Sequence, residues 1–245
     1  DRAVVLVDLP AHGRSDTTHT AWSMARLAWS VVDVLDAAGL SRALVVGNSL
    51  GGATALEVAR LAPSRVVGVG LIAAPGGRRL AAPLRRLARQ LATAENLRTL
   101  SDEAWQIGLA VALRGADTDT TEALLAARRE PARWRAFSRS AAAVLLEVAD
   151  YAPDLSSVDR PALVLHGTAD LLIDAELSAA LADGLPQGRM RRLEGCGHLP
   201  ELECPEALLA ALRPFLDDPE RPKSPPGPHA AGARAPSSRP GRRVR

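Results

Sequence analysis

The 245-residue sequence has few aromatic residues, two cysteines and no long apolar run. A membrane-spanning helix needs about 20 consecutive apolar residues, so a membrane protein is not expected. Two cysteines, Cys196 and Cys204, do not make a disulfide framework, and this favours a reducing, cytoplasmic compartment. Cys196 lies two residues before His198, but no further Cys or His follows at the spacing of a ligand set. We therefore expect no metal and no cofactor.

Charge of both signs is present but unevenly distributed. Residues 221–245 hold seven of the 30 basic residues and none of the 28 acidic residues. The rest of the chain is therefore acidic, which gives no indication of nucleic-acid binding. Residues 218–245 are rich in Pro, Gly, Ser and Arg and offer almost no large apolar side chain, which predicts a disordered tail. The expected partner is a small-molecule substrate, with neither nucleic acid nor membrane, and the oligomeric state stays open.

Buried strands and amphipathic helices alternate along much of the chain. This order predicts an α/β fold with a mostly parallel sheet, flanking helices and right-handed crossovers. Strands are predicted at 3–7, 43–46, 66–72, 162–166 and 189–193, and helices at 21–38, 53–61, 175–183 and 205–216. The run at 4–7 is apolar throughout, so this strand should be buried on both faces.

The stretch between the third and fourth of these strands shows helical patterns only. An apolar stripe through Leu80, Leu84, Leu87 and Leu91 predicts one helix, and Pro131 suits the first turn of another. Shorter helices are predicted at 105–113 and 122–127. We expect residues 1–74 and 156–217 to form the α/β core, with residues 75–155 inserted as a helical lid over the carboxyl edge of the sheet.

Gly47-Asn48-Ser49-Leu50-Gly51 matches G-x-S-x-G and lies between a predicted strand and a predicted helix. That context lets a sharp turn expose the Ser49 hydroxyl as a nucleophile, while Gly47 and Gly51 avoid a clash between strand and helix. The helix N-terminus also places backbone N–H groups near a developing oxyanion. A glycine turn without catalytic function is the alternative interpretation.

A serine nucleophile needs a base, and the base needs an orienting acid. His198 lies in a glycine-containing loop after the last predicted strand, and Asp170 follows the strand at 162–166. Both should meet Ser49 at the carboxyl edge of the sheet, whereas His166, at the end of a strand, suits a structural role. Asp150 and Asp174 are the competing candidates for the acid.

Four segments together resemble the α/β-hydrolase fold family of the lid-bearing, single-domain type. They are Asp8-Leu9-Pro10-Ala11-His12-Gly13-Arg14-Ser15, the Ser49 turn, His166-Gly167-x-x-Asp170, and Gly197-His198 followed by Pro205-Glu206. The resemblance covers residues 1–216 and implies the order Ser, Asp, His. It assigns Ser49 as nucleophile, His198 as base and Asp170 as acid, with the Leu50 N–H as one oxyanion donor.

One departure from the family is an absence. The family carries a His-Gly motif upstream of the position of Asp8, and its loop supplies a second oxyanion N–H. The strand before that loop lies, in the family, between the strands that match 4–7 and 44–47. We therefore expect a chain truncated at its N-terminus, without the second donor, at a cost of about 2.7–4 kcal/mol in transition-state stabilisation. The strand at 4–7 should then lack partners or pair directly with 44–46.

The resemblance implies hydrolysis of a small carboxylic ester or lactone. Gly47-Asn48-Ser49-Leu50-Gly51-Gly52 also resembles the turn of hydrolases that cleave carbon–carbon bonds in ring-fission products, but those carry Trp where this chain has Leu199. A catalytically incomplete fragment that acts only as a binding module is the remaining alternative. Trp105 and Trp134 could line a substrate pocket or pack the lid onto the core.

Overall fold

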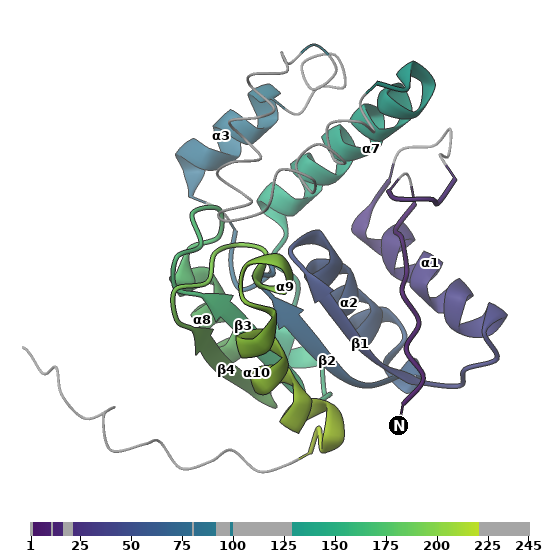
Figure 1. The fold of residues 1–245 in the computed structure, drawn as a ribbon. Coiled ribbons are helices and arrows are strands. Elements are labelled where there is room, and N and C mark those ends of the chain that lie inside the picture. Colours follow the sequence, from purple (N-terminus) through teal and green to yellow (C-terminus); the bar gives the residue numbers. More distant parts are fainter. Residues whose placement is uncertain are drawn as a thin grey trace, which may run out of the picture.

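The computed structural model describes residues 2–10, 12–16, 22–79, 81–91, 99 and 129–220. Its centre is a sheet of four parallel strands in the order β1-β2-β3-β4 (Figure 1). The strands are β1 (Ala43–Asn48), β2 (Val66–Ile72), β3 (Ala162–Gly167) and β4 (Gly188–Leu193). The described helices are α1 (Met24–Ala37), α2 (Leu50–Leu61), α3 (Ala82–Leu91), α7 (Pro131–Asp150), α8 (Ala175–Gly184), α9 (Pro200–Glu203) and α10 (Pro205–Asp217), with short 3-10 turns at Pro63–Arg65 and Leu155–Ser157.

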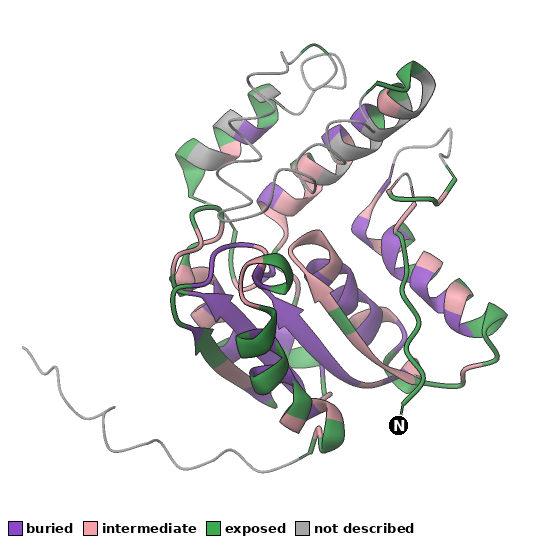
Figure 2. Ribbon diagram, in the orientation of Figure 1, coloured by how far each residue is buried: buried purple, intermediate pink, exposed green. Residues whose placement is uncertain are grey.

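The sheet is covered by helices on both faces, as continuous apolar strands require. On one face, α1, α2 and α8 enclose a core that includes Val31, Leu56 and Leu181. On the other face, α10 packs Leu212 and Phe215 against the sheet. Figure 2 shows the buried colour running through the middle strands. The predicted α/β architecture with a parallel sheet is therefore confirmed.

The prediction of a buried strand at 4–7 is wrong. Residues 2–9 form no strand, and Val4 and Leu6 are 78% and 92% exposed. The apolar run expresses a local preference for extended backbone, but a strand also needs a neighbour that takes up its backbone N–H and C=O groups. Within the described residues, β1 pairs with β2 alone and does not take up residues 4–7 as a partner. Of the two outcomes considered for this segment, the unpartnered one is found.

Helices α3 and α7 belong to the segment expected as a lid. They lie beyond the carboxyl ends of the strands in Figure 1. Arg89 of α3 and Asp150 of α7 join the two helices through an ion pair of 2.7 Å. The predicted helices at 105–113 and 122–127 and the tail from residue 221 onward lie outside the described residues. Among the helices that are described, none has the length and apolarity needed to span a membrane.

Candidate active site

Ser49 occupies a sharp turn between the end of β1 and the start of α2. Its backbone angles are φ 48° and ψ −114°, in a region that residues other than glycine rarely adopt. The Ser49 N–H donates to the Ile72 carbonyl at 2.8 Å, and the Ser49 carbonyl accepts from Ala53 at 3.0 Å. Both neighbours therefore hold the strained residue in place, as a strand–turn–helix nucleophile position requires.

The glycines around Ser49 do not contribute equally. A Cβ on Gly47 would lie 2.2 Å from the Gly51 carbonyl carbon, and one on Gly52 would lie 2.6 Å from the Ala74 Cβ. A Cβ on Gly51 would meet nothing within 4 Å. The expectation that Gly47 and Gly51 both prevent a clash is thus right for Gly47 and wrong for Gly51. The helix turns the Gly51 Cα outward, and Gly52 makes the second close approach.

His198 and Asp170 meet as predicted from the sequence. The His198 Nδ1 lies 2.9 Å from the Asp170 Oδ2, and the side chains of the two residues are 6% and 0% exposed. An ionised carboxylate can only accept hydrogen bonds, so the Nδ1 must carry the proton. In neutral imidazole, the Nε2 is then left as the acceptor, which is the atom that a general base uses.

The Asp170 carboxylate is held in its charged form by its surroundings. Burial by itself raises the pKa of this group, but hydrogen bonds from His198 and from the Ile173 and Leu172 N–H groups outweigh it, so the pKa is lowered overall. The Leu172 N–H donates to Oδ1 at 2.8 Å and the Ile173 N–H at 3.1 Å. One oxygen thus faces the backbone, while the other faces His198.

The two competing acids are engaged elsewhere. Asp150 accepts from Arg89 in the ion pair between α3 and α7. Asp174 caps α8 by accepting the Glu176 N–H at 2.8 Å. Neither is the partner of His198, so the assignment of Asp170 rests on a direct contact that the alternatives lack.

Asn48 connects the Ser49 turn to the His198 loop. Its side-chain amide donates to the His198 carbonyl oxygen at 2.8 Å across 150 residues of sequence. The residue next to Ser49 therefore contacts the residue that pairs with Asp170, at the carboxyl edge of the sheet. This role could not be foreseen, because Asn48 fills a variable position of G-x-S-x-G and the sequence carries no sign of the distant acceptor.

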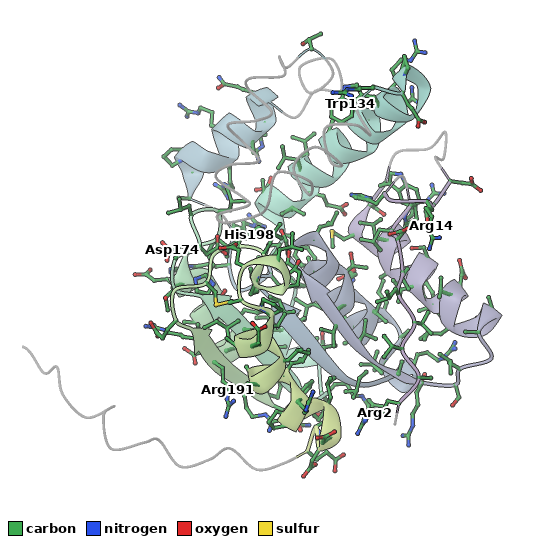
Figure 3. The ribbon with its side chains drawn as sticks, viewed as in Figure 1. Arg2, Arg14, Trp134, Asp174, Arg191 and His198 are labelled. Atoms are coloured by element: carbon green, nitrogen blue, oxygen red, sulfur yellow. A yellow bond between two sulfur atoms is a disulfide. The ribbon has the colours of Figure 1, made fainter. Side chains whose placement is uncertain are left out.

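Cys196 and Cys204 form a disulfide, with the two sulfur atoms 2.00 Å apart (Figure 3). The interpretation that these two cysteines do not make a disulfide framework is therefore wrong. The loop after β4 and the short helix α9 turn the chain back on itself, which brings the two Cα atoms to 6.0 Å. The expectation of a reducing compartment depended on the absence of a disulfide, so it is no longer supported. His198 lies inside the loop that the disulfide closes.

Of the two tryptophans predicted to bind substrate, the structure describes only Trp134. Trp134 is near the start of α7, and Figure 3 shows it at the end of that helix remote from His198. Trp105 lies outside the described residues, so a substrate-binding role for either tryptophan stays a prediction. The Leu50 N–H is in the first turn of α2, where backbone N–H groups have no acceptor within the helix and can serve an oxyanion.

His166, a second buried histidine, contacts a buried hydroxyl. It is 2% exposed, and its Nδ1 lies 3.0 Å from the hydroxyl of the fully buried Ser178. Burial lowers its pKa, which keeps the ring neutral. In the part of the chain that the structure describes, no cluster of three His, Cys, Asp or Glu side chains could hold a metal.

The sequence is similar to those of known proteins. The chain matches the model of the "Alpha/beta hydrolase family" over residues 1–212. It is 31% identical over 228 residues to a 2-hydroxy-6-oxononadienedioate/2-hydroxy-6-oxononatrienedioate hydrolase from Paraburkholderia phymatum, covering 87% of this chain and 76% of that protein. It is 32% identical over 217 residues to a pimeloyl-[acyl-carrier protein] methyl ester esterase from Edwardsiella ictaluri, covering 86% and 82%.

A solved structure supplies the corresponding likeness in three dimensions. The structure of an N-acyl homoserine lactone degrading enzyme superimposes with a TM-score of 0.63 and 29% sequence identity. The match covers 84% of this chain and 80% of that one. The likeness therefore extends over the sheet and its flanking helices and is not confined to one motif.

Proposed function

Because the chain belongs to the α/β hydrolase family and its relatives include a named hydrolase and a named esterase, we propose that it is a serine hydrolase. The substrate is a small carboxylic ester or lactone, and the reaction passes through an acyl-enzyme. The main support for the proposal is the buried His198–Asp170 pair. Asn48, which precedes Ser49 in the turn, donates a hydrogen bond to the His198 carbonyl oxygen. The relatives named as an esterase and as a lactone-degrading enzyme support this choice of substrate.

In the first half of the reaction, the Ser49 Oγ attacks the carbonyl carbon of the substrate. The His198 Nε2 takes the hydroxyl proton, and Asp170 stabilises the imidazolium that forms while it holds the ring in orientation. The Leu50 N–H donates to the oxyanion of the tetrahedral intermediate. When the intermediate collapses, His198 returns the proton to the leaving alkoxide, and the acyl group stays on Ser49.

Water completes the reaction by the same route in reverse. His198 takes a proton from water, the hydroxide attacks the acyl carbon, and collapse of the second intermediate returns the proton to the Ser49 oxygen. The products are a carboxylic acid and an alcohol, or a hydroxy acid from a lactone. No redox step and no cofactor enters this sequence.

Hydrolysis of a carbon–carbon bond in a ring-fission product is the second candidate. It is favoured by the resemblance of the turn from Gly47 to Gly52 and by the relatives named 2-hydroxy-6-oxononadienedioate/2-hydroxy-6-oxononatrienedioate hydrolase. Leu199 stands against it, because the hydrolases that the turn resembles carry Trp after the catalytic histidine. The same Ser49, His198 and Asp170 would serve either reaction.

A substrate panel separates these functions. The purified chain is given 4-nitrophenyl acetate and butyrate, an unsubstituted γ-lactone and a 2-hydroxy-6-oxo-dienoate, and turnover is followed by absorbance or by acid release. The proposal predicts that esters or the lactone are turned over faster than the dienoate. Faster turnover of the dienoate would establish the second candidate. A chain inert to all of them, with its fold intact, would favour a binding module.

A further inference from the structure

The loop that carries His198 is held by a carboxylate that the reaction does not use. Glu203, the last residue of α9, accepts the Gly197 N–H on Oε2 at 2.9 Å and the Leu199 N–H on Oε1 at 3.0 Å. These N–H groups belong to the residues immediately before and after His198. The two oxygens of one side chain therefore fix the backbone on both sides of the proposed base.

The close approach of this carboxylate depends on the glycine before His198. A Cβ on Gly197 would lie 2.5 Å from the Glu203 Oε2, so a side chain there would push the carboxylate away. On the opposite side, the His198 carbonyl accepts from Asn48. Three backbone groups of residues 197–199 thus bond to side chains, and Glu203 supplies two of the three bonds.

We infer that Glu203 is a positioning residue for His198. It holds the N–H groups of the residues on either side of His198, so that the Nδ1 meets Asp170. The disulfide between Cys196 and Cys204 closes the same loop at its ends but does not bond to the peptide groups beside His198. The inference rests on the proposed function, because it concerns how the proposed base is oriented.

Three variants test the inference. Glu203→Gln keeps the shape of the side chain but replaces one accepting oxygen with an amide group that cannot accept an N–H. Glu203→Ala removes both acceptors. Glu206→Gln, at an exposed position in the first turn of α10, is the matched control for loss of a nearby negative charge. Thermal unfolding identifies any variant that no longer folds. If Glu203→Ala does not fold, the result for Glu203→Gln alone decides whether the inference holds.

Two measurements are made on each variant, with and without a phosphine reductant to separate the contribution of the disulfide. The first is the rate of Ser49 labelling by a fluorophosphonate, together with kcat and KM for the best ester of the panel. A hydrogen bond to a charged group contributes about 1.5–3 kcal/mol, equivalent to about 10- to 100-fold in rate. We expect kcat and the labelling rate to fall by about that factor in Glu203→Gln and further in Glu203→Ala, with KM little changed.

The second measurement is the downfield proton resonance of the His198–Asp170 hydrogen bond, which requires no activity. It should weaken or vanish in Glu203→Ala and persist in Glu206→Gln. Unchanged labelling and an unchanged resonance in folded Glu203 variants would overturn the inference, as would equal losses in Glu206→Gln. If the wild-type chain is not labelled at Ser49, the proposed function fails. The resonance then still decides whether Glu203 orients His198.

Discussion

For the glycines of the Ser49 turn, the structure and the sequence motif predict different effects of substitution on stability. G-x-S-x-G marks Gly47 and Gly51 as equivalent, but the structure does not treat them alike. A Cβ on Gly47 would lie 2.2 and 2.3 Å from the carbonyl carbon and oxygen of Gly51 and 2.7 Å from the Gly52 nitrogen. All three are backbone atoms of one helical turn, so no side-chain rotation can relieve the overlap.

Gly47→Ala should therefore destabilise the protein strongly. Overpacking a well-packed site costs about 1–3 kcal/mol and more where backbone must move, so we expect a loss of about 3 kcal/mol or more. Gly52→Ala overlaps with the Ala74 Cβ at 2.6 Å and should cost about 1–3 kcal/mol. Gly51→Ala meets open space within α2, where alanine is favoured over glycine by up to about 1 kcal/mol, so it should be neutral or stabilising.

The assay is urea unfolding of the wild-type chain and the three variants, followed by circular dichroism at one protein concentration. The predicted order of stability is Gly51→Ala equal to or above wild type, then Gly52→Ala, then Gly47→Ala. A Gly51→Ala variant as unstable as Gly47→Ala would refute the reasoning, because it would mean that the motif and not the measured space governs tolerance. Wild-type stability in Gly47→Ala would refute it equally.

Three further predictions concern individual side chains. Asp170→Asn should lower kcat by as much as about 10⁴-fold, because the amide favours the wrong tautomer of His198, and an unchanged kcat in an ester assay would remove Asp170 from the mechanism. Glu57→Ala should lower the free energy of unfolding by about 2–3 kcal/mol, because the Tyr151 hydroxyl donates to this buried carboxylate at 2.9 Å; urea unfolding measures the loss, and a loss within error would contradict it. Burial lowers the pKa of His166 in the folded chain, so the unfolded chain binds the proton more readily and stability should fall as pH drops below about 6.5. Between pH 8 and 5, the melting temperature should decline less steeply in His166→Gln than in the wild-type chain. An equal decline would exclude this histidine as the cause.

Much of the fold could be predicted because its signals are local. The apolar runs of β2 and β3 and the helical periods of α1 and α10 lie within single elements. A parallel sheet then brings strand ends to one edge, which placed Asp170 near His198 without coordinates. The strand predicted at residues 4–7 is wrong because its formation does not depend on local signals alone. A strand also depends on a partner, and no local pattern reports whether one is present.

The contacts that hold the His198 loop could not be predicted from the sequence, for a different physical reason. Asn48 and Glu203 act through backbone groups of the His198 loop, and any residue has such groups, so no pairing pattern appears in the sequence. The link between Cys196 and Cys204 depends on how tightly the loop folds back through α9. The prediction for Gly51 is wrong because a motif records residue types and not the space around them.

In the proposed reaction, Ser49 is the nucleophile and His198 activates it. The most direct test is fluorophosphonate labelling of the purified chain, followed by proteolysis and mass spectrometry of the peptides. We expect one adduct, on Ser49, which disappears in Ser49→Ala and forms much more slowly in His198→Ala. An adduct on another residue, or ester turnover that persists in Ser49→Ala, would contradict it.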